Sequence, residues 1–177
     1  MTDWSRLWDV AEEAIRDHSA MQTHFELSRA LRIASDAGVD TVLEIGSSRG
    51  GTLHAWRQVA STVMALTLPD DETYGQPPPD NSVGYFDSHT KAAHEWLRTQ
   101  LNGSPLDLLF IDGDHTLKGC AADYLNYRSY VRPGGLIMIH DIVFEPGVIE
   151  FWNELDADKH EIINPFGTAF GIGFVKR

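Results

Sequence analysis

Two amphipathic helices are predicted at the start of the chain from the spacing of its apolar residues. Apolar side chains recur every three or four positions over residues 4–17, beginning with Trp4, Leu7 and Trp8. This is the spacing of one face of an α-helix. A second pattern of this kind covers residues 21–37 and stops before Gly38, a residue type that commonly ends helices. We expect the two tryptophans of the first helix to pack in the core or over a site.

After these helices, short apolar runs alternate with helical patterns. Runs that are apolar at nearly every position are typical of strands buried on both faces of a parallel sheet. The alternation predicts an α/β fold with a mostly parallel, seven-stranded sheet, helices on both faces and an antiparallel hairpin at the C-terminus. Residues 69–82 are predicted to form a loop. The expected strands are 41–45, 62–67, 83–86, 107–111, 135–139, 161–163 and 170–175, and the expected helices after the first two are 52–60, 89–101, 117–130 and 146–155.

Composition narrows the choice of partner. A length of 177 residues predicts a single domain over residues 1–177, with N-terminal helices at 1–38 and a Rossmann-like core at 39–177. The formal net charge of −12 argues against a nucleic-acid partner, because phosphate binding needs a basic surface. No apolar run has the length of a bilayer, so we expect no membrane partner. The single Cys120 and the lack of a signal-peptide pattern predict a cytoplasmic protein that acts on a small molecule.

A glycine-containing loop follows the first predicted strand, at residues 44–50 (EIGSSRG). Ligands of open α/β sheets bind beyond the carboxyl ends of the strands, and glycines let them approach the backbone. A dinucleotide fingerprint would read Gly-x-Gly-x-x-Gly, whereas Ser48 stands at its middle glycine here. The carboxylate of Glu44 would repel a phosphate but can accept a hydrogen bond from an ammonium group. A zwitterionic amino-acid ligand would suit this loop, with its carboxylate at the start of the next helix and its ammonium group near Glu44. In the alternative interpretation, the loop is an ordinary glycine turn.

Four blocks of sequence resemble the class I S-adenosylmethionine methyltransferases. The resemblance is closest to the small family that includes cephalosporin-hydroxylase-like and metal-dependent O-methyltransferases, and it implies their Rossmann-like fold. The blocks occur in the family's order and spacing over about residues 41–142. The blocks are 42–52 (VLEIGSSRGGT), 86–89 (FDSH), 107–116 (DLLFIDGDHT) and 132–142 (RPGGLIMIHDI).

The resemblance implies S-adenosyl-L-methionine as cofactor and a set of residues that hold it. Relatives usually carry an acid for the ribose hydroxyls where Thr67 stands here, and Asp70 or Asp71 could take its place. Phe86 replaces a glycine of the second block, which makes the two residues after it the candidates for the adenosine side. The implied cofactor-binding residues are Glu44, Gly46, Ser47, Ser48, Gly50, Thr67, Asp87, Ser88 and Asp112.

Acids and histidines follow the fourth and fifth predicted strands. If these strands are neighbours, as the family order implies, Asp112 and Asp141 lie close enough to share one cation. The resemblance implies Asp112, His140 and Asp141 as metal ligands, with Mg²⁺ as the first candidate and Mn²⁺ as the second. It also implies a catalytic pair of Asp112 and His115, in which His115 acts as general base toward a substrate hydroxyl. In the simpler alternative, Asp114 or Thr116 caps the next helix and the strand-end acids bind only helix N–H groups or water.

The sequence therefore predicts a methyltransferase that modifies a small-molecule hydroxyl with the help of a divalent metal. Two alternatives stay open. One is a non-catalytic domain that binds S-adenosylmethionine, and the other is a nucleotide-dependent oxidoreductase or epimerase on the same fold. A homodimer, in which a partner closes the pocket, is also considered. Tyr74, Trp152, the first helix and the loop 69–82 are candidates for the walls and cover of the pocket.

Overall fold

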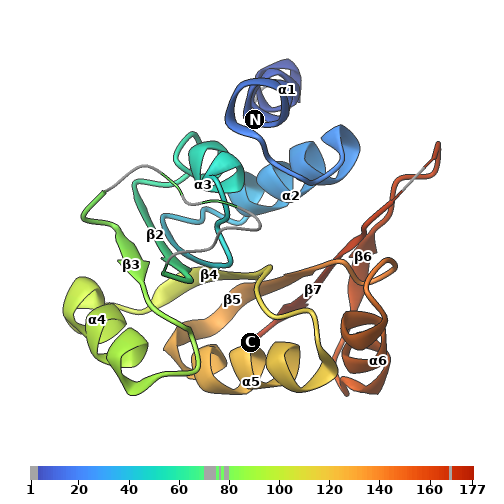
Figure 1. Cartoon of the computed structure of the whole chain (residues 1–177). Helices are drawn as coiled ribbons and strands as arrows, with labels where there is room; N and C mark the ends of the chain where they lie inside the picture. The colour runs from blue at the N-terminus through green and yellow to red at the C-terminus, as the bar shows by residue number, and fades with distance from the viewer. Residues whose placement is uncertain (1–3, 70–74, 76, 78–79, 168) are drawn as a thin grey trace.

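A computed structural model describes the chain except for residues 1–3, 70–74, 76, 78–79 and 168. Figure 1 shows one central sheet between two layers of helices. Within the described residues, the sheet has seven strands in the order β3-β2-β1-β4-β5-β7-β6. The strands are β1 (Thr41–Ile45), β2 (Thr62–Thr67), β3 (Val83–Tyr85), β4 (Leu106–Ile111), β5 (Val131–His140), β6 (His160–Ile162) and β7 (Ile172–Lys176).

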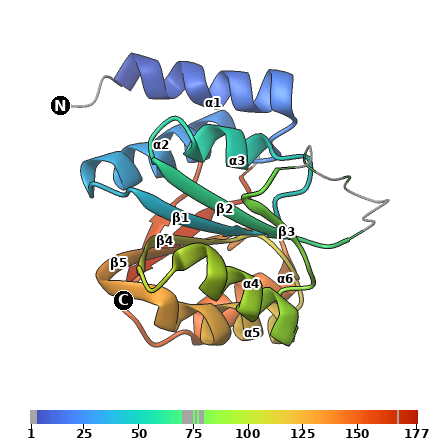
Figure 2. The same cartoon turned by 90° about the vertical axis from the view of Figure 1, so that its left-hand side faces the viewer.

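The helices divide between the two faces of this sheet. Two helices, α2 and α3, cover one face, α4 to α6 cover the other, and α1 lies over α2 and α3 as an outer layer (Figure 2). A short 3₁₀ turn, η1, joins α5 to β5. The helices are α1 (Trp4–His18), α2 (His24–Asp36), α3 (Gly51–Trp56), α4 (Lys91–Leu101), α5 (Leu117–Tyr127) and α6 (Pro146–Glu154), with η1 at Arg128–Tyr130.

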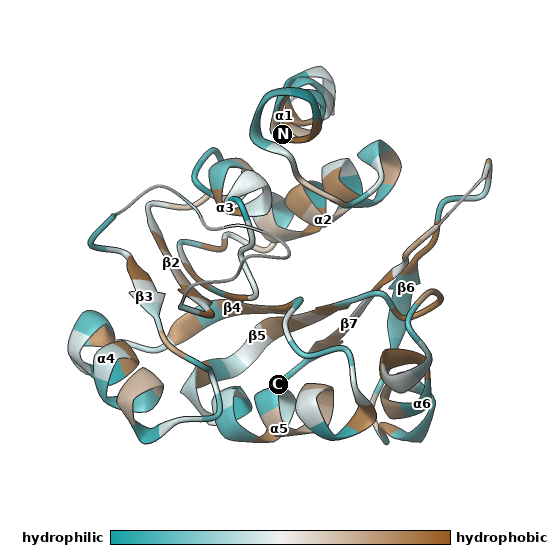
Figure 3. Cartoon of the chain, viewed as in Figure 1, coloured by the Kyte–Doolittle hydropathy of each residue, from teal (hydrophilic) through white to brown (hydrophobic). Residues whose placement is uncertain are grey.

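The predicted fold class is confirmed. Strands β1 to β5 pair in parallel, and β7 runs antiparallel to both β5 and β6. Apolar side chains fill both sides of the sheet, and polar residues lie on the outer faces of the helices (Figure 3). Among the described residues, no helix combines the length and apolar character needed to span a bilayer.

Several predicted boundaries are corrected; helix α5, for example, ends at Tyr127 rather than at residue 130, because η1 begins directly after it. Helix α2 begins at His24 rather than at residue 21, because Thr23 and Glu26 form a reciprocal capping box at its start. Helix α3 ends at Trp56 rather than at residue 60. The chain after it forms tight turns, in which the backbone N–H of Gln58 donates to the carbonyl oxygen of Ala55 and that of Val59 to Trp56. Strand β5 begins four residues earlier than predicted, at Val131, across an irregular register with β4.

The two tryptophans of α1 are not core residues. Trp4 and Trp8 are 42% and 43% exposed, and both pack sideways on α2. The guanidinium groups of Arg29 and Arg32 lie 5.2 Å from the ring of Trp4, and the ring of His24 lies 3.8 Å from that of Trp8. The apolar face of α1 is carried instead by Leu7, Val10, Ala11 and Ala14, which are buried.

Candidate functional site

A cavity of about 450 Å³ opens at the carboxyl ends of the parallel strands. This is the edge at which an open α/β sheet binds ligands, because the chain leaves β1 and β4 in opposite directions there. Seven of the predicted cofactor-binding residues lie in its wall: Gly46, Ser47, Ser48, Thr67, Asp87, Ser88 and Asp112. The lining comes from residues 19–22, 45–48, 51–52, 66–68, 86–89 and 112–115.

The turn after β1 needs glycine at Gly46. This residue has φ 90°, and a Cβ on it would lie 1.9 Å from the carbonyl oxygen of Asp112. Gly51, at the start of α3, is equally crowded, since its Cβ would lie 2.2 Å from the backbone nitrogen of Ala20. The glycines therefore bring the loops after β1 and β4 and the segment before α2 into backbone contact around the cavity.

Two predicted cofactor residues lie outside the lining. Gly50 caps α3 in a left-handed conformation with φ 86° and shapes the turn. Glu44 is fully buried, because it shares a face of β1 with Val42, while the next residue, Ile45, reaches the cavity. Both carboxylate oxygens of Glu44 lack a partner, and burial raises its pKa well above the ordinary value. The contact of Glu44 with an ammonium group stays a prediction.

Asp123 of α5, which the sequence analysis did not single out, holds the segment with Asp87 and Ser88 in place. Asp123 of α5 is buried and accepts a 2.6 Å hydrogen bond from the hydroxyl of Ser88. His89 Nε2 lies 3.1 Å from the same carboxylate oxygen. Burial raises the pKa of Asp123 to about 6. The hydroxyl of Tyr127 donates to the carbonyl oxygen of Ser88 at 2.6 Å, so α5 holds this wall of the cavity at two points.

Acids and histidines meet at one end of the cavity, where β4 and β5 end side by side. His115 Nε2 lies 3.4 Å from Asp112 Oδ1 and 3.3 Å from Asp141 Oδ2. One ligand atom from each of Asp112, His115 and Asp141 can be chosen so that all lie within 4.8 Å of one another. Asp141 adopts φ 65°, a left-handed conformation that is costly outside glycine. Two carboxylates at this end of the cavity repel each other, and the neighbouring histidines offset their charge.

His140 lies behind the two carboxylates rather than beside the cavity. Its ring is 3% exposed, and Nδ1 lies 3.0 Å from Asp112 Oδ1 and 3.1 Å from Asp141 Oδ2. Nε2 is buried without a partner. Burial alone would lower the pKa of His140, but the two acids raise it to about 10. The structure thus supports contact of His140 with both acids, and its predicted role as a metal ligand stays a prediction.

The charges of this cluster depend on one another. Burial alone would raise the pKa of Asp112, but His140 and His115 outweigh it and hold that pKa well below its usual range. The hydrogen bond to Asp112 raises the pKa of His115. Asp112 is therefore ionised at neutral pH, in the form that binds a cation.

Gln22 is a second residue that sequence reasoning missed. It is 4% exposed, donates from Nε2 to Asp112 Oδ2 at 2.8 Å and accepts at Oε1 from the hydroxyl of Thr52 at 2.9 Å. The segment between α1 and α2 is thereby tied to both α3 and the end of β4. A lone glutamine between two helices carries no motif that could have revealed this role.

Several expected wall residues lie elsewhere. Trp152 is buried under β7, where Gly173 leaves room for its ring, and its indole donates to Glu161 at 2.8 Å. It is not a pocket wall, because it is absent from the residues that line the cavity. Asp70, Asp71 and Tyr74 lie outside the described residues. Thr116, and not Asp114, caps α5 by accepting from Gly119 N at 3.0 Å.

Comparison with known proteins decides the family. The sequence model of a methyltransferase-domain family matches residues 14–142, which is most of the chain and includes the cavity and both acids. The chain belongs to this methyltransferase family. A nucleotide-dependent oxidoreductase or epimerase, one of the two alternatives from the sequence, does not agree with this membership.

Individual proteins resemble the chain at low sequence identity. MycE methyltransferase from the mycinamycin biosynthetic pathway, solved with Mg, SAH and mycinamycin VI, is 17% identical with a TM-score of 0.61, over 96% of this chain and 54% of that one. An O-methyltransferase from Bacillus cereus in complex with SAH is 18% identical with a TM-score of 0.56, over 100% and 92% of the two chains. Uncharacterized protein y4gI of Sinorhizobium fredii is 29% identical over 77 residues, 42% of this chain and 8% of that protein.

These relatives limit what the likeness shows. At these identities the solved structures support the class I methyltransferase fold alone. The chain spans about half of the MycE chain (54%) and under a tenth of y4gI (8%). Its own site therefore has to indicate what it binds.

Proposed function

We propose that the methyltransferase transfers the methyl group of S-adenosylmethionine to a hydroxyl oxygen of a small molecule, assisted by a divalent cation. The observation that carries the proposal is the convergence of Asp112, His115 and Asp141 at one end of the cavity. SAH and Mg in the complexes of related proteins support the choice of ligands.

The residues of the cavity suit the cofactor. Ser47 Oγ is buried in the wall without a partner, so it can bond a polar ligand at no cost to an internal contact. Gly46 keeps the loop backbone open to a ligand, and Ser88 and Asp87 face the same space from the other side. The amino-acid end of the cofactor would lie along Gly46–Ser48 and the adenosine end beside Asp87 and Ser88.

The residues of the acid cluster suit a divalent cation. Two carboxylates with one imidazole fit Mg²⁺ or Mn²⁺, and the imidazole favours Mn²⁺ over Mg²⁺. When bound, the cofactor supplies an electrophilic methyl group and the cation supplies positive charge beside the acceptor oxygen. Gln22 and His140 keep Asp112 in place by hydrogen bonds. His115 faces the cavity with a 30% exposed side chain and can hold the proton of the acceptor hydroxyl or serve as the third ligand.

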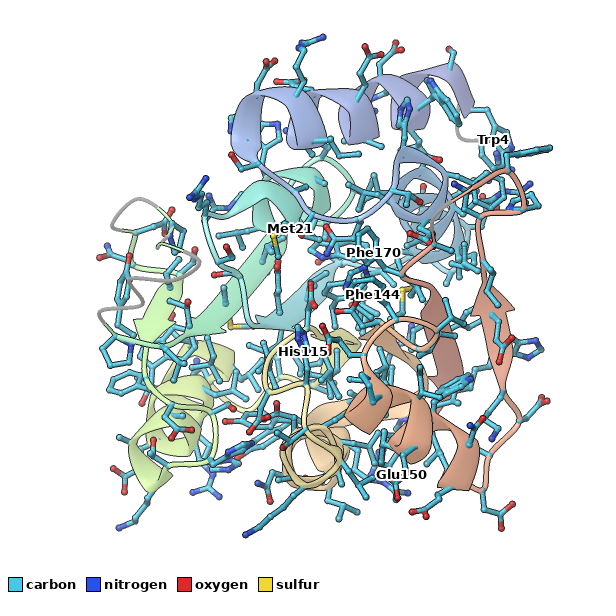
Figure 4. All side chains as sticks on the ribbon, turned by 45° about the vertical axis from the view of Figure 1, so that its right-hand side comes forward. Trp4, Met21, His115, Phe144, Glu150 and Phe170 are labelled. Atoms are coloured by element: carbon cyan, nitrogen blue, oxygen red, sulfur yellow. The ribbon has the colours of Figure 1, made fainter. Side chains whose placement is uncertain are left out.

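Apolar side chains gather beside the cluster. Figure 4 shows Met21 above His115, with Phe144 and Phe170 to one side. Met21 and Phe144 are each 52% exposed, and the rings of Phe144 and Phe170 meet edge to face with centroids 5.0 Å apart. Exposed apolar groups at the mouth of a polar site suit an acceptor that joins a hydroxyl group to an apolar body.

The proposal is tested by methyl transfer from radiolabelled S-adenosylmethionine to a panel of hydroxyl acceptors, with Mg²⁺ or Mn²⁺ present. We expect Asp112→Asn to lower the rate at least about 100-fold, because it removes a carboxylate that would hold the cation beside the acceptor oxygen. Asp158→Asn is the matched control, since that side chain is 96% exposed, and it should retain full activity.

Two outcomes would contradict the proposal. Full transfer after exhaustive chelation, or from Asp112→Asn, would refute the role of the cation. Cofactor binding without transfer to any acceptor would favour a domain that only binds S-adenosylmethionine. In His115→Gln, weaker metal binding would assign the ligand role, and unchanged binding with a slower rate would assign the proton-acceptor role.

A further inference from the structure

A second cluster with metal-ligand character lies where the end of α1 meets α3. It consists of Glu13 and His18 from α1 and His54 from α3. His54 Nε2 lies 3.5 Å from Glu13 Oε1, and His18 Nε2 lies 3.9 Å from the same oxygen. One ligand atom from each residue lies within 4.8 Å of the other two. None of the three takes part in the site described above.

The contacts within this cluster are poor hydrogen bonds. An N–H···O bond between such groups has a length of about 2.9 Å, and both separations from Glu13 are longer. His54 Nε2 is buried and has no hydrogen-bond partner, although Glu13 Oε1 lies 3.5 Å from it. A buried polar atom without a hydrogen-bond partner destabilises the folded chain. A ligand bound between the three side chains would supply the missing partner.

The separations suit a cation. Ligands at about 2.1 Å from a tetrahedral metal ion lie about 3.4 Å from one another. The two measured separations from Glu13 are 3.5 and 3.9 Å. Because an imidazole binds an ion in its ring plane, the two stacked rings have to turn toward each other before all three atoms reach one ion. The side chains of His18 and Glu13 are 40% and 50% exposed, which leaves a fourth position open to water.

The two histidine rings of the cluster lie against each other. They stack with centroids 3.8 Å apart and planes inclined by 17°, so the cluster brings two imidazoles and one carboxylate together. An imidazole nitrogen without an internal partner, such as His54 Nε2, is a group that a metal ion can bind.

We propose that Glu13, His18 and His54 form a second metal site, for a transition-metal cation of the Zn²⁺ type. Two imidazole nitrogens and one carboxylate favour Zn²⁺ over Mg²⁺ or Ca²⁺, which prefer oxygen ligands. The ion joins α1 to α3 beside the cavity, because His18 immediately precedes the lining residues 19–22 and His54 follows the loop after β1. It thereby fastens the outer helix to the rim of the cavity.

Calorimetric titration of the chelator-treated full chain with Zn²⁺ tests this site separately from the catalytic cluster. An Asp112→Asn, Asp141→Asn background removes the acids of the catalytic cluster. In that background we expect one Zn²⁺ per chain, with an affinity that His54→Gln lowers at least tenfold. His160→Gln, a half-exposed histidine beside Asp158, is the matched control and should leave the affinity unchanged.

Two further arms keep the test decisive. Because His54 is only 25% exposed, its variant could fold poorly, so the exposed His18→Gln provides the same reading, and circular dichroism checks the fold of each. Co²⁺ added in place of Zn²⁺ should give visible absorption that both variants lose. Absence of Zn²⁺ binding in the background variant, or equal affinity with and without His54 and His18, would overturn the proposal.

Discussion

At the residue scale, the cavity depends on points where two backbones touch. Gly46 is such a point, because a Cβ there would overlap the carbonyl group of Asp112. The amide of Asp112 in turn donates to the carbonyl oxygen of Ile45 at 2.8 Å. The loop that is proposed to hold the cofactor and the acid that is proposed to hold the cation are therefore fixed to each other directly.

Replacement of Gly46 by alanine should lower the free energy of unfolding far more than the same change at Gly103. Both residues have positive φ, but a Cβ on Gly103 would meet nothing within 4 Å. Gly103→Ala should therefore cost about 1–2 kcal/mol from backbone strain alone. Gly46→Ala should cost more than about 3 kcal/mol, because the overlap adds to the strain. Urea unfolding measures both, and equal losses would show that the contact with Asp112 is not rigid.

Asp123 makes stability depend on pH in a defined window. Its ordinary pKa is 3.8, and in the folded chain burial raises it to about 6. The folded state thus favours the protonated acid, so the stability from this group is fully present below about pH 4 and is lost as the pH rises to about 6.

Asp123→Asn should remove that loss, because asparagine stays neutral. Relative to the variant, the wild-type chain should lose roughly 3 kcal/mol at most between pH 4 and pH 7, as two units of pKa imply. Urea unfolding at pH 4, 5, 6 and 7 measures the difference. Stabilities that run parallel across this range would contradict the assigned environment of Asp123.

Site residues that belong to a local sequence block could be predicted, and those that act through distant contacts could not. Asp112, His115 and Asp141 each follow an apolar strand in a characteristic block, so the sequence identified them. Gln22 and Asp123 act through partners 90 and 35 residues away. Such contacts arise only when α2 and α5 pack against the sheet, and no spacing in the sequence reports them.

At the scale of elements, the periodic patterns located the six α-helices and seven strands of the described residues, but not all of their ends. The two patterns over α1 and α2 were separated correctly, yet the start of α2 is set by side-chain hydrogen bonds rather than by apolar spacing. Thr23 accepts from Glu26 N, and Glu26 Oε2 accepts from Thr23. Glu26 Oε1 also accepts from Gly171 N at 2.8 Å, which ties the start of α2 to the approach to β7.

Thr23→Ala should destabilise the chain by about 1 kcal/mol, through loss of the cap. Thr99→Ala is the matched control, because Thr99 lies inside α4 and its hydroxyl bonds only the carbonyl oxygen of Glu95 at the surface. That variant should be neutral or slightly more stable, since alanine favours helix. Guanidinium unfolding compares the two, and an equal effect would mean that the capping box adds nothing to stability.

At the scale of the whole molecule, the strand order creates the site. Because β4 lies between β1 and β5, the loop after β1 and the acids after β4 and β5 reach the same edge of the sheet. Alternating strands and helices predicted this architecture, and the family match over residues 14–142 agrees with it. The proposed metal site between α1 and α3 could not be predicted, since its three side chains come from two elements that are far apart in the sequence.

We expect the cofactor methyl group and the divalent cation to lie side by side in this cavity. Nuclear magnetic resonance of S-adenosylmethionine labelled with ¹³C in its methyl group, bound to the protein, tests this directly when Mn²⁺ is added. We predict strong broadening of the methyl signal in the wild-type chain and in His54→Gln, which lacks the second metal site, and little broadening in Asp112→Asn. A bound cofactor whose methyl signal stays sharp with Mn²⁺ present would contradict the account.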